Sequence, residues 1–386
     1  MTERTDLRGA AASDPHRPLP NDDAVRGDGA DASVVMGAGA ASATAKVILF
    51  GEHAVVYGYP AIAVPVAALT VRADVRPALG GSTIDSALFS GPLADAPARL
   101  RPTAVAAEAA LTALGAAHTP VAVRIRSDIP AERGVGSSAA VAAAVVGAVA
   151  DALQVTLDAD RHHELIQIAE RAAHGTPSGL DARAVRAAGP IWFRSGDVEP
   201  LTVAVPLVFV IADTGVRGRT GEAVAAVRAL REEFPVHTDE VIAALGDLAV
   251  SARDDLASGD AESLGRRMTR AHALLGELGA GDAALDRLAK AALAAGALGA
   301  KLTGGGRGGC LLALARSAAH AEDLETALRA AGATDVWATT VPATGAQASD
   351  APAAPAAPAE SVPVRPVSRT RTPVGSEQIT NVEQTR

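Results

Sequence analysis

Apolar and polar positions along this 386-residue chain predict a mixture of strands and helices. Residues 121–127 (VAVRIRS) alternate apolar and polar side chains, as a half-buried strand does. In the segment 158–173 apolar residues return every three or four positions, which predicts a helix capped by Asp158 or Asp160. Because the two patterns mix without strict alternation, we predict an α+β fold.

The remaining elements follow from the same two patterns. The expected strands cover 46–50, 61–66, 69–76, 121–127, 191–194 and 206–213, followed by a strand and turn over 298–315 and a final helix and strand. The expected helices cover about 103–114, 137–153, 158–173, 219–233, 238–257, 260–276 and 282–295.

Composition changes at both ends of the chain. Residues 1–41 show little apolar periodicity, and residues 343–386 begin with an Ala/Pro repeat. Segments of this kind bury too little apolar surface to fold, so we expect two disordered tails. The length between them predicts two domains, 42–195 and 196–342, that share a cleft.

Net charge, apolar runs and cysteine content argue against several classes of protein for this chain. A formal net charge of −9 argues against a nucleic-acid partner, which needs a basic face. No long apolar run predicts a membrane span, and no apolar stretch near residue 1 resembles a signal peptide. The single cysteine, Cys310, cannot form an internal disulfide, and its apolar neighbours predict a buried, inert thiol. These features predict a cytoplasmic protein.

Lysine is rare and unevenly placed. The chain has 35 Lys plus Arg, of which only Lys46, Lys290 and Lys301 are lysines. Lys46 and Lys301 lie in glycine-rich motifs, where a compact ammonium differs in function from a planar guanidinium. The alternative, that packing alone explains the lysine, is favoured for Lys301.

Three glycine-rich turns stand at distant points of the chain. In KVILFGEHAVVYG (46–58) an apolar strand ends in Gly-Glu-His, which presents polar groups at a sheet edge where ligands bind. Similar turns occur at 134–138 and 304–309. Together the three turns predict a single phosphate-binding pocket.

The second turn reads AERGVGSSAA over residues 131–140. Gly134 and Gly136 let the backbone approach an anion, and Ser137 and Ser138 begin a helix whose free N–H groups favour phosphate. A dinucleotide-binding pattern also fits, but no apolar strand ending in an acidic residue follows. A Walker A loop is excluded because no Gly-Lys-Ser/Thr follows, and an ordinary turn stays as an alternative.

Two acidic residues follow this turn. Glu170 lies near the end of the 158–173 helix, and Asp181 follows across Pro177 and two glycines, so both carboxylates can face one cleft. Phosphoryl transfer needs a divalent cation and a group that takes the hydroxyl proton. Glu170 with Ser138 suits Mg²⁺, and Asp181 suits the base. Taken singly, Glu170 also fits a solvated helix residue and Asp181 a helix cap.

Four segments, KVILFGEHAVVYG, ERGVGSSAA, HGTPSGLDAR and AKLTGGGRGGC, resemble in this order the motifs of the GHMP kinases. The first is similar to the mevalonate kinase family in particular, and the resemblance covers about residues 43–342. It implies an N-terminal domain like ribosomal protein S5 domain 2, a ferredoxin-like C-terminal domain and ATP between them. The implied reaction is the Mg²⁺- and ATP-dependent phosphorylation of the 5-hydroxyl of (R)-mevalonate, in the mevalonate route to isoprenoids.

The resemblance also implies the roles of individual residues. Lys46 resembles the catalytic lysine and Asp181 the catalytic base. Ser138 and Glu170 resemble the Mg²⁺ ligands. The residues that resemble substrate-binding positions are Glu52, His53 and Thr220. Those that resemble ATP-binding positions are Gly134, Val135, Gly136, Ser137, Ser138, Ala139, Gly304, Gly305 and Gly306.

Some questions stay open at this point. Arg307 stands where the third motif usually has Gly, and Glu132-Arg133 replaces the usual start of the second motif. His162 and His163 are expected at the surface. A sister kinase for galactose, homoserine or phosphomevalonate and a catalytically silent relative stay as alternatives. The expected partners are mevalonate and ATP, with a homodimer as an open question.

Overall fold

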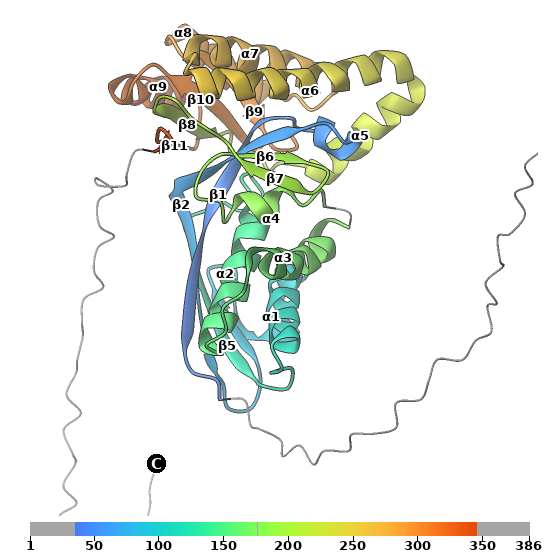
Figure 1. The fold of residues 1–386 in the computed structure, drawn as a ribbon, viewed down its shortest axis with the longest axis vertical. Coiled ribbons are helices and arrows are strands. Elements are labelled where there is room, and N and C mark those ends of the chain that lie inside the picture. Colours follow the sequence, from blue (N-terminus) through green and yellow to red (C-terminus); the bar gives the residue numbers. More distant parts are fainter. Residues whose placement is uncertain (1–34, 176, 346–386) are drawn as a thin grey trace, which may run out of the picture. The chain divides into compact units, whose positions relative to one another are not determined.

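Two β-sheets organise the chain in the computed structural model, which describes residues 35–175 and 177–345 (Figure 1). The first sheet has the order β4-β3-β5-β2-β6-β7, with β1 paired to β2. Its strands are β1 (Gly39–Phe50), β2 (Ala61–Pro77), β3 (Thr83–Ser86), β4 (Phe89–Pro92), β5 (Val121–Ser127), β6 (Ile191–Arg194) and β7 (Asp197–Pro200). The second sheet has the order β11-β8-β10-β9, with β8 (Leu207–Asp213), β9 (Gly299–Thr303), β10 (Cys310–Ala315) and β11 (Asp335–Val341).

Helices accompany each sheet. Those beside the first sheet are α1 (Arg101–Ala113), α2 (Ser137–Ala152), α3 (Ala159–His174) and α4 (Leu180–Ala184). The later helices are α5 (Thr220–Glu233), α6 (Pro235–Ser258), α7 (Ala261–Glu277), α8 (Ala283–Ala294) and α9 (Ala318–Ala330). Short 3₁₀ turns cover η1 (Ala54–Tyr57), η2 (Leu93–Asp95) and η3 (Ala98–Leu100). Helices α7, α8 and α9 pack on strands of the second sheet.

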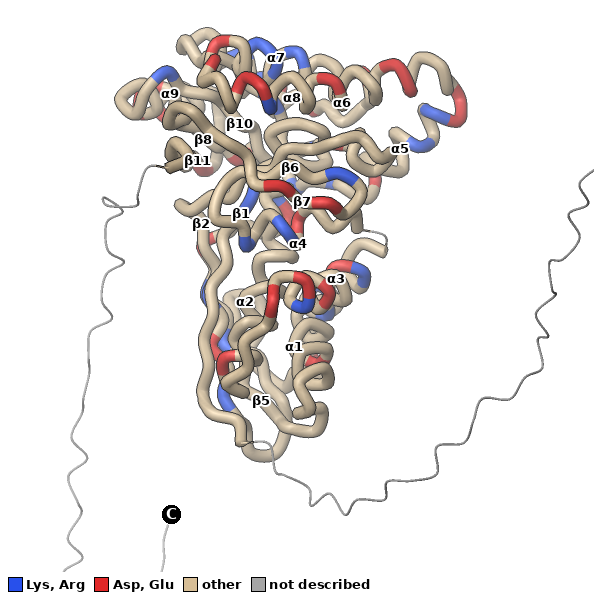
Figure 2. The backbone as a smooth tube through the Cα atoms, in the orientation of Figure 1, with Lys and Arg blue, Asp and Glu red and all other residues tan. Residues whose placement is uncertain are grey.

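Helix α2 is the centre of the first half because its residues are small and apolar. Asp151 is its only charged residue, and the helix is almost entirely tan in Figure 2. Val145, Val146 and Val149 are fully buried, and burying each side chain contributes about 1.5–3 kcal/mol. A Cβ at Gly147 would lie 2.7 Å from Ala41 of β1, so only glycine allows this close packing. The packing fixes the start of α2, where the second glycine-rich turn ends.

The β1–β2 hairpin carries the first motif to that turn. Its register shifts between Thr44 and Ala45 and again between Ile48 and Phe50. Lys46 stands opposite Pro65, which has no N–H to donate. The Lys46 N–H instead donates to the carbonyl of Val135 at 3.0 Å. The irregular hairpin thereby ties Lys46 to the second glycine-rich turn by its backbone.

The mixed α+β class is confirmed, and several element boundaries differ from expectation. Residues 61–66 and 69–76 form the single strand β2, and β3, β4 and β7 were not anticipated. Because β7 pairs with β6, the first sheet continues beyond the expected domain limit at residue 195. A hairpin cannot be divided between domains without breaking its ladder, so the sequence-based limit is too early.

The expected tails are also shorter than predicted. Residues 39–41 belong to β1, and the Thr344 N–H donates to the carbonyl of Val203 at 2.8 Å. The other expected tail residues, 1–34 and 346–386, lie outside the described part. The surface placement of His162 is wrong. Its side chain is buried, and its Nε2 donates to the carbonyl of Ala143 at 3.1 Å.

Candidate active site

An ion pair between Lys46 and Asp181 forms the centre of the candidate site. The Lys46 Nζ lies 2.8 Å from the Asp181 Oδ1, although the two residues are far apart in sequence. The Lys46 side chain is 2% exposed, whereas Asp181 keeps 37%. The ammonium is therefore closed off by protein, and the carboxylate is open on one side to a reactant.

Gly136 explains how the lysine reaches this carboxylate. A Cβ at this position would lie 2.9 Å from the Lys46 Cγ and 3.0 Å from its Cε. Gly136 also has φ +76, a backbone conformation that favours glycine. The glycine of the second motif therefore has a specific task, which is to leave room for the lysine stem of the first motif.

The start of α2 presents free donors beside this pair. Gly136 is the N-cap of the helix and makes no side-chain capping hydrogen bond. The first backbone N–H groups of a helix have no partner within it, and the helix dipole adds positive potential there. Ser137 and Ser138 occupy this first turn, so the local geometry suits a phosphate group.

Glu170 of α3 supplies a buried carboxylate near the same point. Its side chain is 4% exposed, and its Oε1 has no hydrogen-bond partner among the described residues. Burial raises the pKa of Glu170, and the nearby Asp181 adds to the rise, whereas Ser138, His174 and Lys46 oppose it. His174 lies 4.0 Å away and is half exposed.

The orphaned oxygen of Glu170 fits a divalent cation. A buried carboxylate oxygen without a partner is costly unless a cation or donor completes it. Among the described residues, no three His, Cys, Asp or Glu side chains cluster into a metal-binding group. Mg²⁺ is often held by one or two protein oxygens plus substrate phosphates, so Glu170 with the Ser138 hydroxyl is sufficient.

The Gly-Glu-His turn after β1 is closed rather than open. Glu52 has no exposed surface, and His53 is 6% exposed. His53 adopts φ 61, which is unusual for a residue other than glycine. Its Nε2 donates to the carbonyl of Gly305 at 3.0 Å, and burial lowers its pKa, so the ring is neutral with the Nδ1 left as an acceptor.

The third motif packs directly on the other two. A Cβ at Gly304 would lie 2.8 Å from the Gly134 carbonyl oxygen, and one at Gly305 would lie 2.7 Å from Thr220. Thr220 begins α5 and is exposed. The three glycine-rich turns and Thr220 therefore meet at one place, as the sequence predicts, through close backbone contacts.

Arg307 has a clear structural role. It adopts φ 55, the left-handed conformation expected where related motifs have glycine. Its backbone N–H donates to the carbonyl of Ala280 at 2.8 Å, and its Nε donates to that of Gly279 at 3.0 Å. The arginine thus fastens the loop between α7 and α8 to the third motif.

A hydroxyl that the sequence interpretation missed joins the first and third motifs. The Thr303 Oγ1 accepts from the Ile48 N–H at 2.9 Å and donates to the Ile48 carbonyl at 3.1 Å. In the sequence, the only indication is that Thr303 precedes a glycine-rich turn. Its partner is 255 positions away, so no local pattern could identify it.

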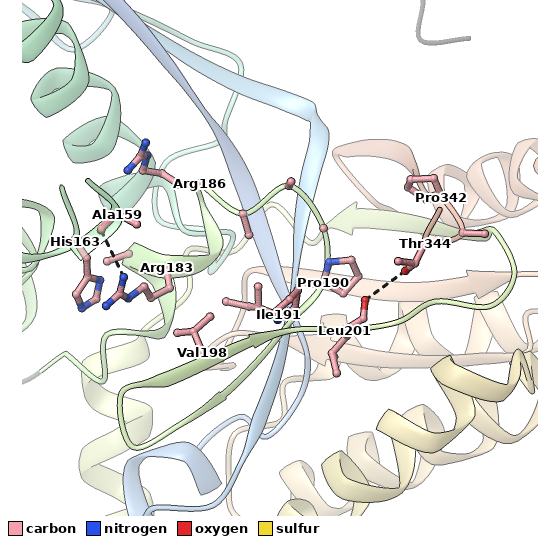
Figure 3. Close-up of a pocket in the computed structure, with 16 residues that line it drawn as sticks. Ala159, His163, Arg183, Arg186, Pro190, Ile191, Val198, Leu201, Pro342 and Thr344 are labelled. Carbon is pink, nitrogen blue, oxygen red and sulfur yellow. Dashed lines mark hydrogen bonds between the residues drawn. The ribbon is translucent and has the colours of Figure 1, made fainter. Parts of the chain in front are cut away.

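A cavity of about 520 Å³ lies beside α4, separate from the reacting groups (Figure 3). Arg183, His163, Ile191 and Leu201 are part of its wall, whereas Asp181 is not. In this wall the Arg183 Nη1 donates to the carbonyl of Ala159 at 3.4 Å. The candidate site is therefore not this cavity but the half-open surface around the exposed side of the carboxylate.

Comparisons with known proteins identify the family of this chain. The family described as GHMP kinases N terminal domain matches residues 102–188, and the family described as GHMP kinases C terminal matches residues 252–334. Mevalonate kinase from Thermococcus gammatolerans is 37% identical over 317 residues, which are 76% of this chain and 93% of that protein. The chain belongs to the mevalonate kinase family of the GHMP kinases.

Solved structures of mevalonate kinases share the fold. The L. major enzyme in complex with R-mevalonate has a TM-score of 0.71 and 27% identity, covering 81% of this chain and 98% of that one. The mevalonate kinase from methicillin-resistant Staphylococcus aureus MRSA252 has a TM-score of 0.61 and 31% identity, covering 79% of this chain and 99% of that one.

In the part of this chain that the structure describes, no helix has the length and apolar character that crossing a bilayer would require.

Proposed function

We propose that this chain transfers the γ-phosphoryl group of ATP to the 5-hydroxyl of (R)-mevalonate, giving 5-phosphomevalonate and ADP for isoprenoid synthesis. The observation that carries the proposal is the 2.8 Å pair of Lys46 and Asp181 beside the uncapped start of α2. Membership of the mevalonate kinase family supports the choice of substrate. The L. major relative was solved with R-mevalonate bound.

The pair divides the chemistry of the transfer. The 5-hydroxyl oxygen forms a bond to the γ-phosphorus, the bond from that phosphorus to the β–γ bridging oxygen breaks, and ADP leaves with that oxygen. Asp181 accepts the hydroxyl proton on its exposed side. Lys46 holds the carboxylate in place and stabilises negative charge on the attacking oxygen. A fixed, buried ammonium does this without reorganising water.

Backbone groups hold the nucleotide in this proposal. The N–H groups at the start of α2, with Gly134, Val135, Gly136, Ser137, Ser138 and Ala139, surround the phosphates. The third-motif glycines Gly304, Gly305 and Gly306 hold the second motif from the other side. Gly304 lies against Gly134 and Gly305 against Thr220, so neither position leaves room for a side chain.

Mg²⁺ is the proposed cofactor. When bound, it neutralises charge on the phosphate oxygens and orients them for in-line transfer. Ser138 and Glu170 would hold it, and the unpartnered Oε1 of Glu170 supports this assignment. Burial and the nearby Asp181 raise the pKa of this carboxyl group, and a bound cation would favour its ionised form.

Two substrate contacts are proposed from the surroundings of Asp181. His53 offers its Nδ1 and the exposed Thr220 offers its hydroxyl, and Gly305 contacts both residues. Glu52, a third candidate from the sequence, has no exposed surface. We also propose that the protein is cytoplasmic and forms a homodimer. Light scattering on the purified full chain tests the dimer.

A substrate panel tests the function. Purified full-length protein is assayed for ADP release with (R)-mevalonate, phosphomevalonate, galactose and homoserine, each with ATP and Mg²⁺. We expect ADP release with mevalonate, and mass spectrometry should find one added phosphoryl group. A clear preference for another substrate of the panel, or no turnover with any of them, would contradict the proposal.

A further inference from the structure

A second lysine–carboxylate pair, Lys301 with Glu52, lies behind the candidate site. Lys301 belongs to β9 and Glu52 to the turn after β1. Both side chains are fully buried, and the Lys301 Nζ is bonded to the Glu52 Oε1. Neither side chain is therefore free to contact a reactant in the way that Asp181 is.

The ammonium of Lys301 uses all three of its N–H donors. Besides Glu52, it donates to the carbonyl of Leu302 at 2.7 Å and to that of Ile48 at 3.3 Å. An ammonium has three donors and no acceptor, so this set is complete. One side chain therefore joins the end of β1, the turn that follows it and β9.

The two charges depend on each other. Burial raises the pKa of Glu52, and Lys301 lowers it by its charge and its hydrogen bond. Burial lowers the pKa of Lys301, and Glu52 raises it. The charge of Lys46 acts on both members, favouring ionised Glu52 and disfavouring protonated Lys301. The charge of the candidate active-site lysine therefore influences both members of the buried pair.

The turn that the pair holds also carries other site residues. His53 follows Glu52 at an unfavourable φ of 61 and contacts Gly305, and Ile48 is bonded to Thr303. A strained conformation persists only where the surroundings fix it strongly. The Lys301–Glu52 bond adds an ion pair to the neutral hydrogen bonds that hold this turn.

We propose that Lys301 and Glu52 are positioning residues of the phosphoryl transfer. Lys301 is bonded to Glu52 inside the protein, and the pair fixes the turn that places His53 and holds Lys46 in register with Asp181. Glu52 then acts through the protein and not as a ligand of the substrate. This inference rests on the proposed function for its kinetic test and stands independently in its stability test.

The kinetic test uses Glu52→Gln, which keeps the size and removes the charge. Positioning predicts that kcat falls about tenfold while KM for mevalonate changes less than about threefold, measured well below the unfolding temperature of the variant. A pair that only stabilised the fold would leave kcat unchanged under these conditions. An unchanged kcat, or a KM that rises by more than kcat falls, overturns the inference; the latter result would make Glu52 a direct substrate ligand.

The stability test is a double-mutant cycle with Glu52→Gln and Lys301→Met in urea, without substrate. Lys301→Met leaves a carboxylate buried and unpaired, so we expect the double variant to lose less stability than the sum of the single losses. Additive losses overturn the inference. If Lys301→Met does not fold while the double variant does, that rescue is the same coupling in a stronger form; if neither folds, the kinetic test on Glu52→Gln decides.

Matched controls separate the pair from general effects. Lys290→Met and Glu277→Gln make the same chemical changes at exposed positions of α8 and α7, and should leave kcat and urea midpoint unchanged. A wild-type protein that is inactive with mevalonate would count against the proposed function. The urea cycle would still test the coupling of the two charges.

Discussion

The two lysine–carboxylate pairs of this chain join the same chemical groups in different surroundings. Lys46 meets an acid that is 37% exposed, whereas Lys301 meets one with no exposure. An acid open on one side can exchange a proton with a reactant, and a closed acid can only hold its partner. The comparison teaches that residue type does not separate catalysis from positioning, and that the exposure of the acid does.

The largest expected effect comes from a substitution in the Lys46–Asp181 pair, the open pair, whose acid is partly exposed. Asp181→Asn keeps the shape of the side chain but removes the proton acceptor, so kcat should fall about 10²–10⁴-fold, as for other general bases. Isothermal titration should show ATP binding within a few-fold of wild type. The exposed Asp323→Asn on α9 is the matched control. Turnover near the wild-type rate in Asp181→Asn would remove this residue as the base.

The lysine of the open pair comes next. Lys46→Met should lower kcat about 10²–10³-fold, since a single electrostatic contact to the transition state has this weight. Lys46→Arg should not restore the rate, because a planar guanidinium differs in shape and donor geometry from the compact ammonium that is enclosed here. Lys290→Arg, exposed on α8, controls for the substitution itself. A fully active Lys46→Arg enzyme would show that only the charge matters here.

Gly136→Ala sharpens the comparison without touching either charge. The new Cβ would meet the Lys46 stem at 2.9–3.0 Å on a backbone of positive φ. We expect a fall in kcat of about ten- to a hundredfold, because a small displacement of a catalytic group costs about that much. Gly276→Ala on α7 meets no atom within 4 Å and should be silent. An unimpaired Gly136→Ala enzyme would show that the lysine does not need this space.

Glu170 tests whether a buried acid beside the open pair serves a cation. Glu170→Gln removes the charge and keeps one carbonyl oxygen, so the Mg²⁺ concentration for half-maximal activity should rise about tenfold. Glu164→Gln lies on the exposed face of the same helix and controls for the change. A metal titration that coincides with wild type would exclude Glu170 as a ligand.

The smallest effect concerns His162, a buried ionisable group that bonds to a carbonyl oxygen instead of a carboxylate. Burial lowers its pKa from 6.5 to about 4, with a smaller contribution from Arg186. Acid therefore protonates the unfolded chain first, and the free energy of unfolding should fall as the pH drops from 6.5 towards 4. His162→Gln should flatten this slope in urea unfolding across pH, and the exposed His118→Gln should not.

Other histidines with lowered pKa values limit how flat the stability profile can become. Burial also lowers the pKa values of His53 and His272, so part of the acid sensitivity should persist in His162→Gln. An unaltered slope in that variant would mean that His162 does not titrate in this range. That result would leave the comparison of the two lysine pairs unaffected.

Local patterns predicted much of the fold. The alternation at 121–127 gave β5 with the correct ends, and Asp158 does cap α3, where it accepts the N–H of Arg161 at 2.7 Å. These features depend on neighbours within a few residues, which the sequence contains. The short strands β3 (TIDS), β4 (FSGP) and β7 (DVEP) were missed because they hold few apolar residues, whereas β6 (IWFR), equally short, was recognised by its apolar run.

The geometry of the candidate site was predicted in part, and the chemical roles of its residues stay predictions. Motif spacing and resemblance brought Lys46 and Asp181 together correctly. Glu52 was expected to line the pocket and is instead fully buried against Lys301, a residue for which packing was favoured. The two are 249 positions apart, and no local pattern relates residues over that distance.

The sequence by itself predicted most of the strands and helices, and it suggested which residues bind phosphate, hold the metal and act as the base. It could do so because backbone propensity and hydrophobic periodicity act over a few positions. Only the tertiary structure decided which lysine meets an acid with an exposed side and which one meets an enclosed acid. Exposure depends on the sum of contacts with distant segments, here Gly136 against Lys46 and β1 against Lys301, and that sum exists only after the chain has folded.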